Sequence, residues 1–214
     1  YRLSHLYTLT VGLRTDFANA SINDPEQDFL DLYGGEIKSV NETNVSGTLS
    51  VKYQNGSSQM QLALGRGVRT ASMIERFINH FAVGVDPYEY VGNPYLKPEV
   101  NNQVELSYAN KISQMEFGAS VFYSLIEDYI VPIVDEDIPR KFMPNTEPTH
   151  AKRFVNINKA MQTGFELYWN YHITYDLKFS SDFSYTYAKN KEYEEPLPQI
   201  TPFTTNLALK YERS

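Results

Sequence analysis

The sequence contains no cysteine among its 214 residues. A disulfide framework and a thiolate metal site are therefore both excluded. No apolar run approaches the ~20 residues that a membrane-spanning helix requires. The N-terminus does not resemble a secretory signal peptide, and the first residue is Tyr1 rather than Met. We therefore expect the chain to be processed from, or cut out of, something longer.

Basic charge is also scarce. The chain has 19 basic and 26 acidic residues, which gives a formal net charge of −7. This balance argues against nucleic acid as a partner, because nucleic-acid-binding surfaces are usually basic. In contrast, the chain is rich in tyrosine, with 17 Tyr beside 12 Phe and one Trp. Tyrosine suits a boundary that is apolar on one side and wet on the other.

Catalytic signatures are missing as well. The four histidines lack the spacing of a zinc protease helix, and no motif frames a serine as an activated nucleophile. The acidic runs at Asp135–Asp137 and Glu192–Glu195 have the character of solvated loop surface rather than of a carboxylate pair aimed at one bond. The sequence therefore predicts neither an enzyme nor a bound cofactor.

What the sequence does have is apolar and polar residues in strict alternation. The segment from Met115 to Leu125 places Met, Phe, Ala, Val, Tyr and Leu on one face, with Phe122 as the exception on the polar face. Such a period of two predicts a strand with two different faces. The best candidate for a helix is a short one within residues 71–81. Eight strands are expected, at residues 5–14, 43–54, 58–68, 101–111, 113–127, 160–172, 175–188 and 202–212.

The connections between these strands alternate between short and long. Asn55-Gly56 is a strong hairpin signal, and the turns near residues 112 and 173 are equally short. The intervening connections are long, at residues 15–42, 69–100, 128–159 and 189–201. Tight turns at one end and long loops at the other are typical of an outer-membrane barrel. A soluble β-sandwich with one solvated face would show the same alternation within its strands.

Several motifs resemble those of TonB-dependent outer-membrane receptors, and they occur in the family's order. Val91–Glu99 reads VGNPYLKPE, which is similar to a family signature between an extracellular loop and a descending strand. The stretch from Phe77 to Asn93 looks closest to the copper-receptor branch. The other similar segments are Val11–Asp16, Arg66–Ala71, Phe122–Ile130, Asn156–Glu166 and Pro196–Pro202.

The resemblance implies an all-β fold, an antiparallel transmembrane β-barrel segment. The family's barrel has 22 strands, so residues 1–214 would be a partial barrel domain, with the plug domain and the remaining strands absent. It also implies a Gram-negative outer-membrane location in contact with lipid. The intact protein would import a scarce nutrient, either a metal-siderophore complex or copper, driven by a TonB-type energy-coupling protein acting through the plug.

Two pairs of residues are candidates for contact with a transported metal. Met73 and His80 share one long connection, and Met143 and His150 share another. Thioether and imidazole ligands suit copper, so loops that converge above the lumen would offer a transient site. The plainer interpretation is that each methionine fills a gap and each histidine is exposed.

Arginines are the candidates for binding an anionic chelate. Arg66, Arg69 and Arg76 flank the root of one long connection, and guanidinium groups form directed bonds to oxyanions. The alternative is that they pair with carboxylates of the protein.

The sequence alone leaves three rival interpretations of the whole chain open. A complete small eight-stranded barrel would have a structural or adhesive role, and its interior would be filled by side chains. A soluble β-sandwich would bind carbohydrate and would need no detergent. A hydrolase is the third rival, and it would show turnover on glycan or ester substrates.

Overall fold

The computed structural model describes residues 1–82, 84, 86–198 and 200–213. Val83 and Val85, in the Phe77–Asn93 stretch, lie outside the described residues, as do Gln199 of the Pro196–Pro202 motif and the C-terminal Ser214. The described chain forms one ten-stranded sheet, in which β4 (Phe81–Ala82) and β5 (Glu89–Val91) are short strands within a loop. The eight expected strands are therefore confirmed.

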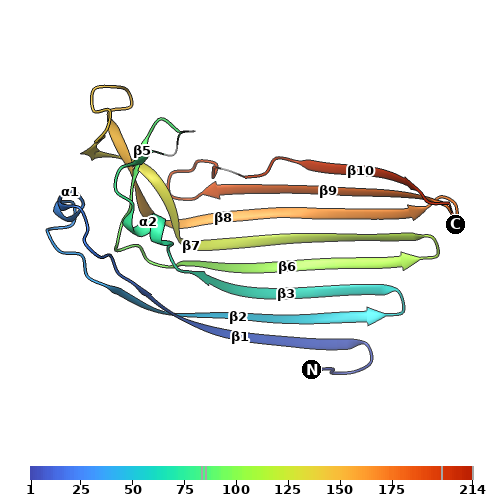
Figure 1. The fold of residues 1–214 in the computed structure, drawn as a ribbon. Helices are drawn as coiled ribbons and strands as arrows, with labels where there is room; N and C mark the ends of the chain where they lie inside the picture. The colour runs from blue at the N-terminus through green and yellow to red at the C-terminus, as the bar shows by residue number, and fades with distance from the viewer. Residues whose placement is uncertain (83, 85, 199, 214) are drawn as a thin grey trace.

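The eight long strands lie side by side in chain order, as Figure 1 shows. Every neighbouring pair among them is antiparallel. The short strand β5 pairs with β8 in parallel, the one such pairing within the described residues. In the described residues the sheet is not closed, because β1 pairs only with β2 and β10 only with β9. The strands are β1 (Tyr7–Ala20), β2 (Val40–Asn55), β3 (Ser58–Arg69), β6 (Glu99–Ile112), β7 (Met115–Pro139), β8 (His150–His172), β9 (Leu177–Asn190) and β10 (Thr204–Tyr211).

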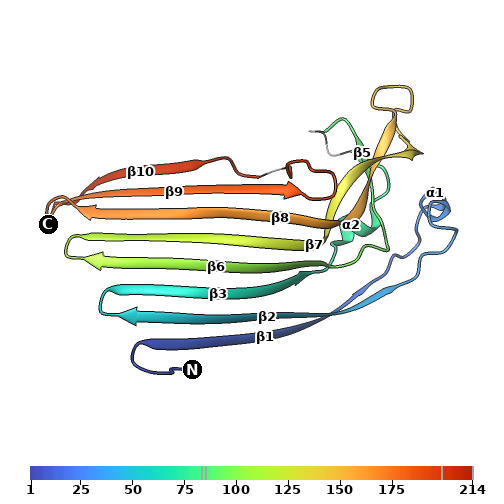
Figure 2. The ribbon, with the colours of Figure 1, turned by 180° about the vertical axis from the view of Figure 1, so that it is seen from behind.

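Short turns lie at one end of the sheet and all long connections at the other, which is clearest in Figure 2. The turn between β2 and β3 contains Gly56 at φ +55°, a left-handed conformation that glycine adopts without strain. No helix in the described part of the chain is long and apolar enough to cross a membrane.

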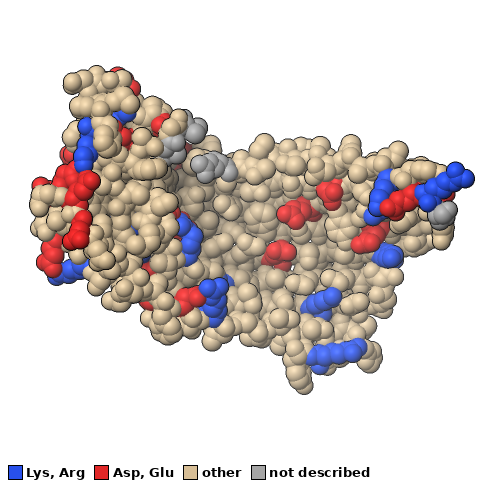
Figure 3. Space-filling model, in the orientation of Figure 1, with Lys and Arg blue, Asp and Glu red and all other residues tan. Residues whose placement is uncertain are grey.

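The two faces of the sheet differ in chemistry. Leu49, Leu64 and Val104 lie in register on neighbouring strands of one face and keep 43%, 48% and 39% of their surface exposed. A soluble sandwich would bury such a row, whereas a lipid-facing barrel wall leaves it uncovered. The opposite face carries Gln103, Glu105 and other polar residues, and Figure 3 shows acidic side chains over the middle of the sheet.

Aromatic rings line the outward face at the turn end. The Tyr7 and Tyr53 rings lie 5.1 Å apart, and the Trp169 ring lies 6.0 Å from that of Phe179. Tyrosine and tryptophan at this level of a barrel wall match the aromatic girdle at a membrane–water interface.

The structure corrects the strand bounds at the loop end. The expected loop 128–159 is mostly strand, because β7 continues to Pro139 and β8 begins at His150. This extended hairpin rises beyond the rest of the sheet in Figure 1. Hydrophobic residues pack on both of its faces, so the alternation that marks the lower strands is lost there. The expected short helix is confirmed as α2 (Met73–Phe77), whereas α1 (Gln27–Asp31) was missed.

Candidate ligand-binding loops

The long connections pack together into an ordered cap over one end of the sheet. Phe29 of α1 is buried against Val91 of β5, Ile138 of β7 and Ala151 of β8. These four residues come from three different connections, so burying them fixes the loops relative to one another. The loop end is therefore a shaped surface rather than a set of independent segments.

Helix α2 is held by its cap and by the motif that follows it. Ser72 and Glu75 form a reciprocal capping box at its N-terminus. The backbone N–H of Gly92 donates to the Ile78 carbonyl, and that of Asn93 donates to the Glu75 carbonyl. A Cβ on Gly92 would lie 2.5 Å from the Arg76 carbonyl carbon, so only glycine permits this close approach.

A buried carboxylate fastens the tip of the β7–β8 hairpin. Glu89 accepts hydrogen bonds from the backbone N–H groups of Lys141 and Phe142, and it pairs with Arg140 at 3.3 Å. Burial alone would raise the pKa of Glu89. The hydrogen bonds outweigh burial, and the pKa lies below the usual value of 4.5.

A second ionic cluster surrounds Lys152 of β8. Its ammonium lies 2.6 Å from the Asp86 carboxylate and 4.2 Å from the centre of the Tyr88 ring. Tyr90 donates its hydroxyl to the same carboxylate at 2.7 Å, and burial raises the pKa of this phenol to about 12. Burial also acts to raise the pKa of Asp86, but the bonds from Lys152, Tyr88 and Tyr90 bring it below its usual range.

Two tyrosines and an arginine form a third cluster in the cap. The rings of Tyr33 and Tyr95 meet edge to face at 5.9 Å, and Tyr33 lies beside Arg153. Arg153 pairs with Asp135 at 2.7 Å, but its buried Nε has no hydrogen-bond partner among the described residues. A buried donor without a partner is costly. The Arg153 side chain as a whole keeps 35% of its surface exposed, so its guanidinium is accessible to an oxyanion.

The predicted metal residues differ in their exposure and in the contacts that they already make. The ring nitrogens of buried His80 contact Asn79 Oδ1 and the Pro139 carbonyl, so the described chain already occupies them. Met73 and Met143 are exposed, and the Nδ1 of His150 lies 3.1 Å from the Thr149 hydroxyl. Within the described ranges, no three His, Cys, Asp or Glu side chains gather in a way that could hold a metal ion.

The three predicted arginines have three different environments. Arg76 is completely buried, where it pairs with Glu42 and donates to the Pro94 carbonyl at 2.8 Å. Arg69 is shared between Glu75 and Glu99, at 2.9 and 2.6 Å. Arg66 lies on the outward face of β3, where its guanidinium donates to Asn102 Oδ1 at 3.1 Å.

Sequence reasoning missed Tyr33, Tyr95, Lys152 and Arg153. The only signal available was the density of tyrosine in the long connections. No periodicity places loop residues, so their convergence follows from tertiary packing alone.

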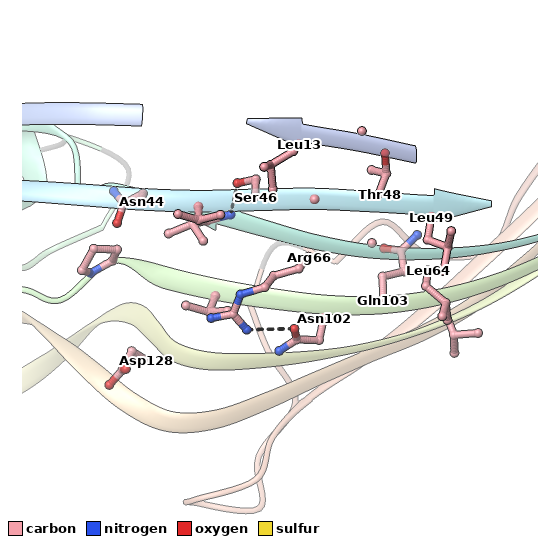
Figure 4. Close-up of a pocket in the computed structure, with 18 of the residues that line it drawn as sticks. Leu13, Asn44, Ser46, Thr48, Leu49, Leu64, Arg66, Asn102, Gln103 and Asp128 are labelled. Carbon is pink, nitrogen blue, oxygen red and sulfur yellow. Dashed lines mark hydrogen bonds between the residues drawn. The ribbon is translucent and has the colours of Figure 1, made fainter. Parts of the chain in front are cut away.

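A groove lies below the cap, in the sheet itself. Backbone pairing between β2 and β3 ends at Gly47 and Arg66, although each strand stays paired with its other neighbour beyond that point. The resulting gap is bridged by side chains: Ser46 accepts from the Val68 N–H at 3.1 Å, and Asn44 donates to the Thr70 hydroxyl at 2.8 Å. The groove has a volume of about 1050 Å³, and Figure 4 shows Arg66 and Asn102 pointing toward one another within it.

The fold is similar to that of solved transport receptors. The copper transporter OprC is 21% identical with a TM-score of 0.74, and the match covers 98% of this chain and 30% of OprC. The siderophore receptor PirA from Pseudomonas aeruginosa is 16% identical with a TM-score of 0.68, and the match covers 99% of this chain and 35% of PirA. The FrpB iron transporter from Neisseria meningitidis is 18% identical with a TM-score of 0.64, and the match covers 97% of this chain and 28% of FrpB. The chain thus spans about a third of the length of these structures.

No curated protein sequence matches the chain. The sequence model of the family described as "TonB dependent receptor-like, beta-barrel" matches residues 1–214, which is the entire sequence. Together with the open antiparallel sheet and its uncovered apolar face, this match identifies the chain as barrel wall. The chain belongs to the β-barrel family of TonB-dependent receptors.

Proposed function

We propose that the protein containing this chain is an energy-coupled receptor of the outer membrane, and that it imports an anionic metal chelate. The chain contributes part of the barrel wall and part of the extracellular mouth. The observation that carries the proposal is the Tyr33–Tyr95–Arg153 cluster. There the Nε of Arg153 has no hydrogen-bond partner among the described residues, and Arg153 lies beside Tyr33, whose ring meets that of Tyr95. Guanidinium and aromatic groups together suit a planar, oxygen-rich anion.

The test is uptake of a radiolabelled ferric chelate by cells whose only receptor is the full-length protein. Replacing Arg153 by Ala removes a charged hydrogen-bond donor, which is worth about 1.5–3 kcal/mol. The half-saturation concentration should rise by roughly 10-fold or more. Arg153→Lys keeps the charge that faces Asp135 but loses the forked geometry, so it should show an intermediate defect.

Lys38→Ala is the matched control, because Lys38 is an exposed cation in the cap outside the three clusters. Unchanged uptake by Arg153→Ala, with a receptor that remains resistant to added protease, would refute this role for the cluster. A variant that becomes protease-sensitive would be set aside in favour of Arg153→Lys, which retains the ion pair.

Copper is the second candidate cargo, supported by the exposure of Met73 and Met143, at 56% and 53%. Soft thioether ligands favour Cu(I), and His80 and His150 lie on the same connections. Copper accumulation should then fall in the Met73→Ala, Met143→Ala double variant while uptake of ferric chelates stays unchanged. The opposite pattern would favour the chelate.

Energy coupling is proposed to come from a TonB-type partner acting on a plug held within the complete barrel. The polar inward face, with Gln103 and Glu105 among its residues, supports a wet lumen that could hold such a domain. Dissipating the proton-motive force should abolish uptake but leave binding of labelled chelate at the cell surface intact. Uptake that survives the uncoupler would point to passive diffusion through the barrel.

A further inference from the structure

The groove between β2 and β3 opens on the outward, apolar face. Leu62, Leu64 and Arg66 alternate along β3 with residues of the polar face, so all three side chains point outward. Leu13 and Leu49 complete the apolar walls. The side chains that bridge the gap, Asn44 and Ser46, occupy alternate positions of β2 and close the groove toward the inward face.

Arg66 is an unusual residue for this face. Its partner on β2 is Gly47, which has no side chain, and Arg66 is exposed. It donates one hydrogen bond, of 3.1 Å, to Asn102 Oδ1, and no carboxylate pairs with it in the described part of the chain. An arginine on a lipid-facing strand is retained where its head reaches the polar boundary or an anionic partner.

A second cation borders the groove. The side chain of Lys97 is 72% exposed, and its ammonium is 3.7 Å from the Asp128 carboxylate. Asp128 is the one acidic residue among the described groove-lining residues, against the two cations Arg66 and Lys97. The groove thus combines apolar walls with a net positive rim at the loop end of the strands.

We propose that this groove binds a lipid from the outer leaflet whose phosphate headgroup carries a net negative charge. The phosphate would bind between Arg66 and Lys97, and an acyl chain would lie against Leu13, Leu49 and Leu64. Charge complementarity selects this occupant, because an uncharged lipid would leave Arg66 without an anionic partner. The volume of about 1050 Å³ suits one chain and one headgroup rather than a protein segment that needs a broad interface.

The experiment is native mass spectrometry of the full-length receptor reconstituted with equal amounts of phosphatidylglycerol and phosphatidylcholine of the same acyl chains. The wild type should retain phosphatidylglycerol in preference. The Arg66→Gln, Lys97→Gln double variant should lose about fivefold in retention for each cation removed. Lys52→Gln is the matched control, since Lys52 lies on β2 but points to the opposite face.

Four outcomes would overturn the proposal. Equal retention of both lipids by the wild type would show that the net charge of the headgroup does not select the lipid. Undiminished retention by the double variant would remove the role of the cations. A double variant that changes from dimer to monomer would assign the groove to a second copy of the protein. Displacement of the lipid by millimolar inorganic phosphate would show a free-anion site, whereas persistence of the lipid supports the proposal. Leu64→Trp, which fills the groove with apolar bulk, should lower retention without removing charge.

Discussion

At the scale of single residues, the family-like motifs perform structural tasks. Gly92 permits the close approach of the α2 backbone. The Asn156 side chain accepts a hydrogen bond from the Lys97 N–H and donates to the carbonyls of Lys97 and Asp128. Glu99 accepts a hydrogen bond from the Ile130 N–H and forms an ion pair with Arg69. These residues tie loops to strand ends, so the motifs report how the cap is built and carry no information on the cargo.

Arg76 gives the first prediction. Arg76→Ala leaves Glu42, whose side chain is 10% exposed, without its cation, and breaking a buried pair costs about 3–5 kcal/mol. Residues 70–98 should become cleavable by protease in the folded receptor, as read by mass spectrometry of the fragments. Arg14→Ala removes an exposed pair with Asp16, worth about 1 kcal/mol or less, and should change nothing. Equal protection in both variants would contradict the proposed support of the cap by Arg76.

Glu89 gives a pH prediction. Its folded pKa is below the unfolded value of 4.5, so the stabilisation it provides is complete above that pH. It is lost as the pH falls through the lower folded pKa. Protection factors for hydrogen exchange at the Lys141 and Phe142 amides should therefore hold near neutral pH and collapse in acid. In Glu89→Gln the protection should be low throughout, and an acid collapse persisting in that variant would assign the effect to another group.

At the scale of elements, the sequence predicted the strands well wherever one face is polar. The prediction failed where both faces of a strand have the same environment. This is the case in the β7–β8 extension from Tyr129 to Val155, whose residues pack against loops. Helix α1 has no side-chain cap, and its position depends on burial of Phe29, so no local signal marked it. The cap clusters escaped prediction for the same reason, because they are assembled from separate connections.

Phe122 was the exception in the alternation of β7, and the sheet explains it. Its ring covers Gly164 on β8, as the Tyr168 ring covers Gly118 on β7. An aromatic side chain over a glycine on the neighbouring strand packs the bare backbone of that glycine. The pairs differ in one respect. The three atoms nearest to a Cβ on Gly118 all belong to the Tyr168 side chain, whereas the atom nearest to a Cβ on Gly164 is the Tyr185 carbonyl oxygen, at 2.4 Å.

The difference between the two pairs gives a prediction for strand packing. Gly118→Ala and Gly164→Ala should each cost about 1–3 kcal/mol by overpacking, read as a lower unfolding midpoint in detergent. Adding Tyr168→Ala should relieve the first substitution, so the double-mutant cycle will show strong coupling. Adding Phe122→Ala should not relieve the second, because the carbonyl clash remains. Relief of both would show that backbone approach is not limiting at Gly164.

At the scale of the whole molecule, the assignment of faces decides which substitutions the barrel tolerates. Leu62 and Gln61 are neighbours on β3 and point to opposite sides. Leu62 lies between Val51 and Leu106 in an exposed apolar row, so we assign it to lipid. Arginine near the bilayer midplane of a barrel costs about 2–4 kcal/mol, whereas a wet lumen accepts it at little cost.

The last prediction follows from that assignment. Leu62→Arg should lower the folded fraction of the full-length receptor in lipid vesicles, measured by the loss of its heat-modifiable band. Gln61→Arg adds the same side chain one residue away and should leave that fraction unchanged. A soluble β-sandwich would give a different result, because arginine on its buried face would abolish folding with or without lipid. Equal tolerance of both substitutions would mean that neither face meets lipid, and the lipid-binding groove would fail with it.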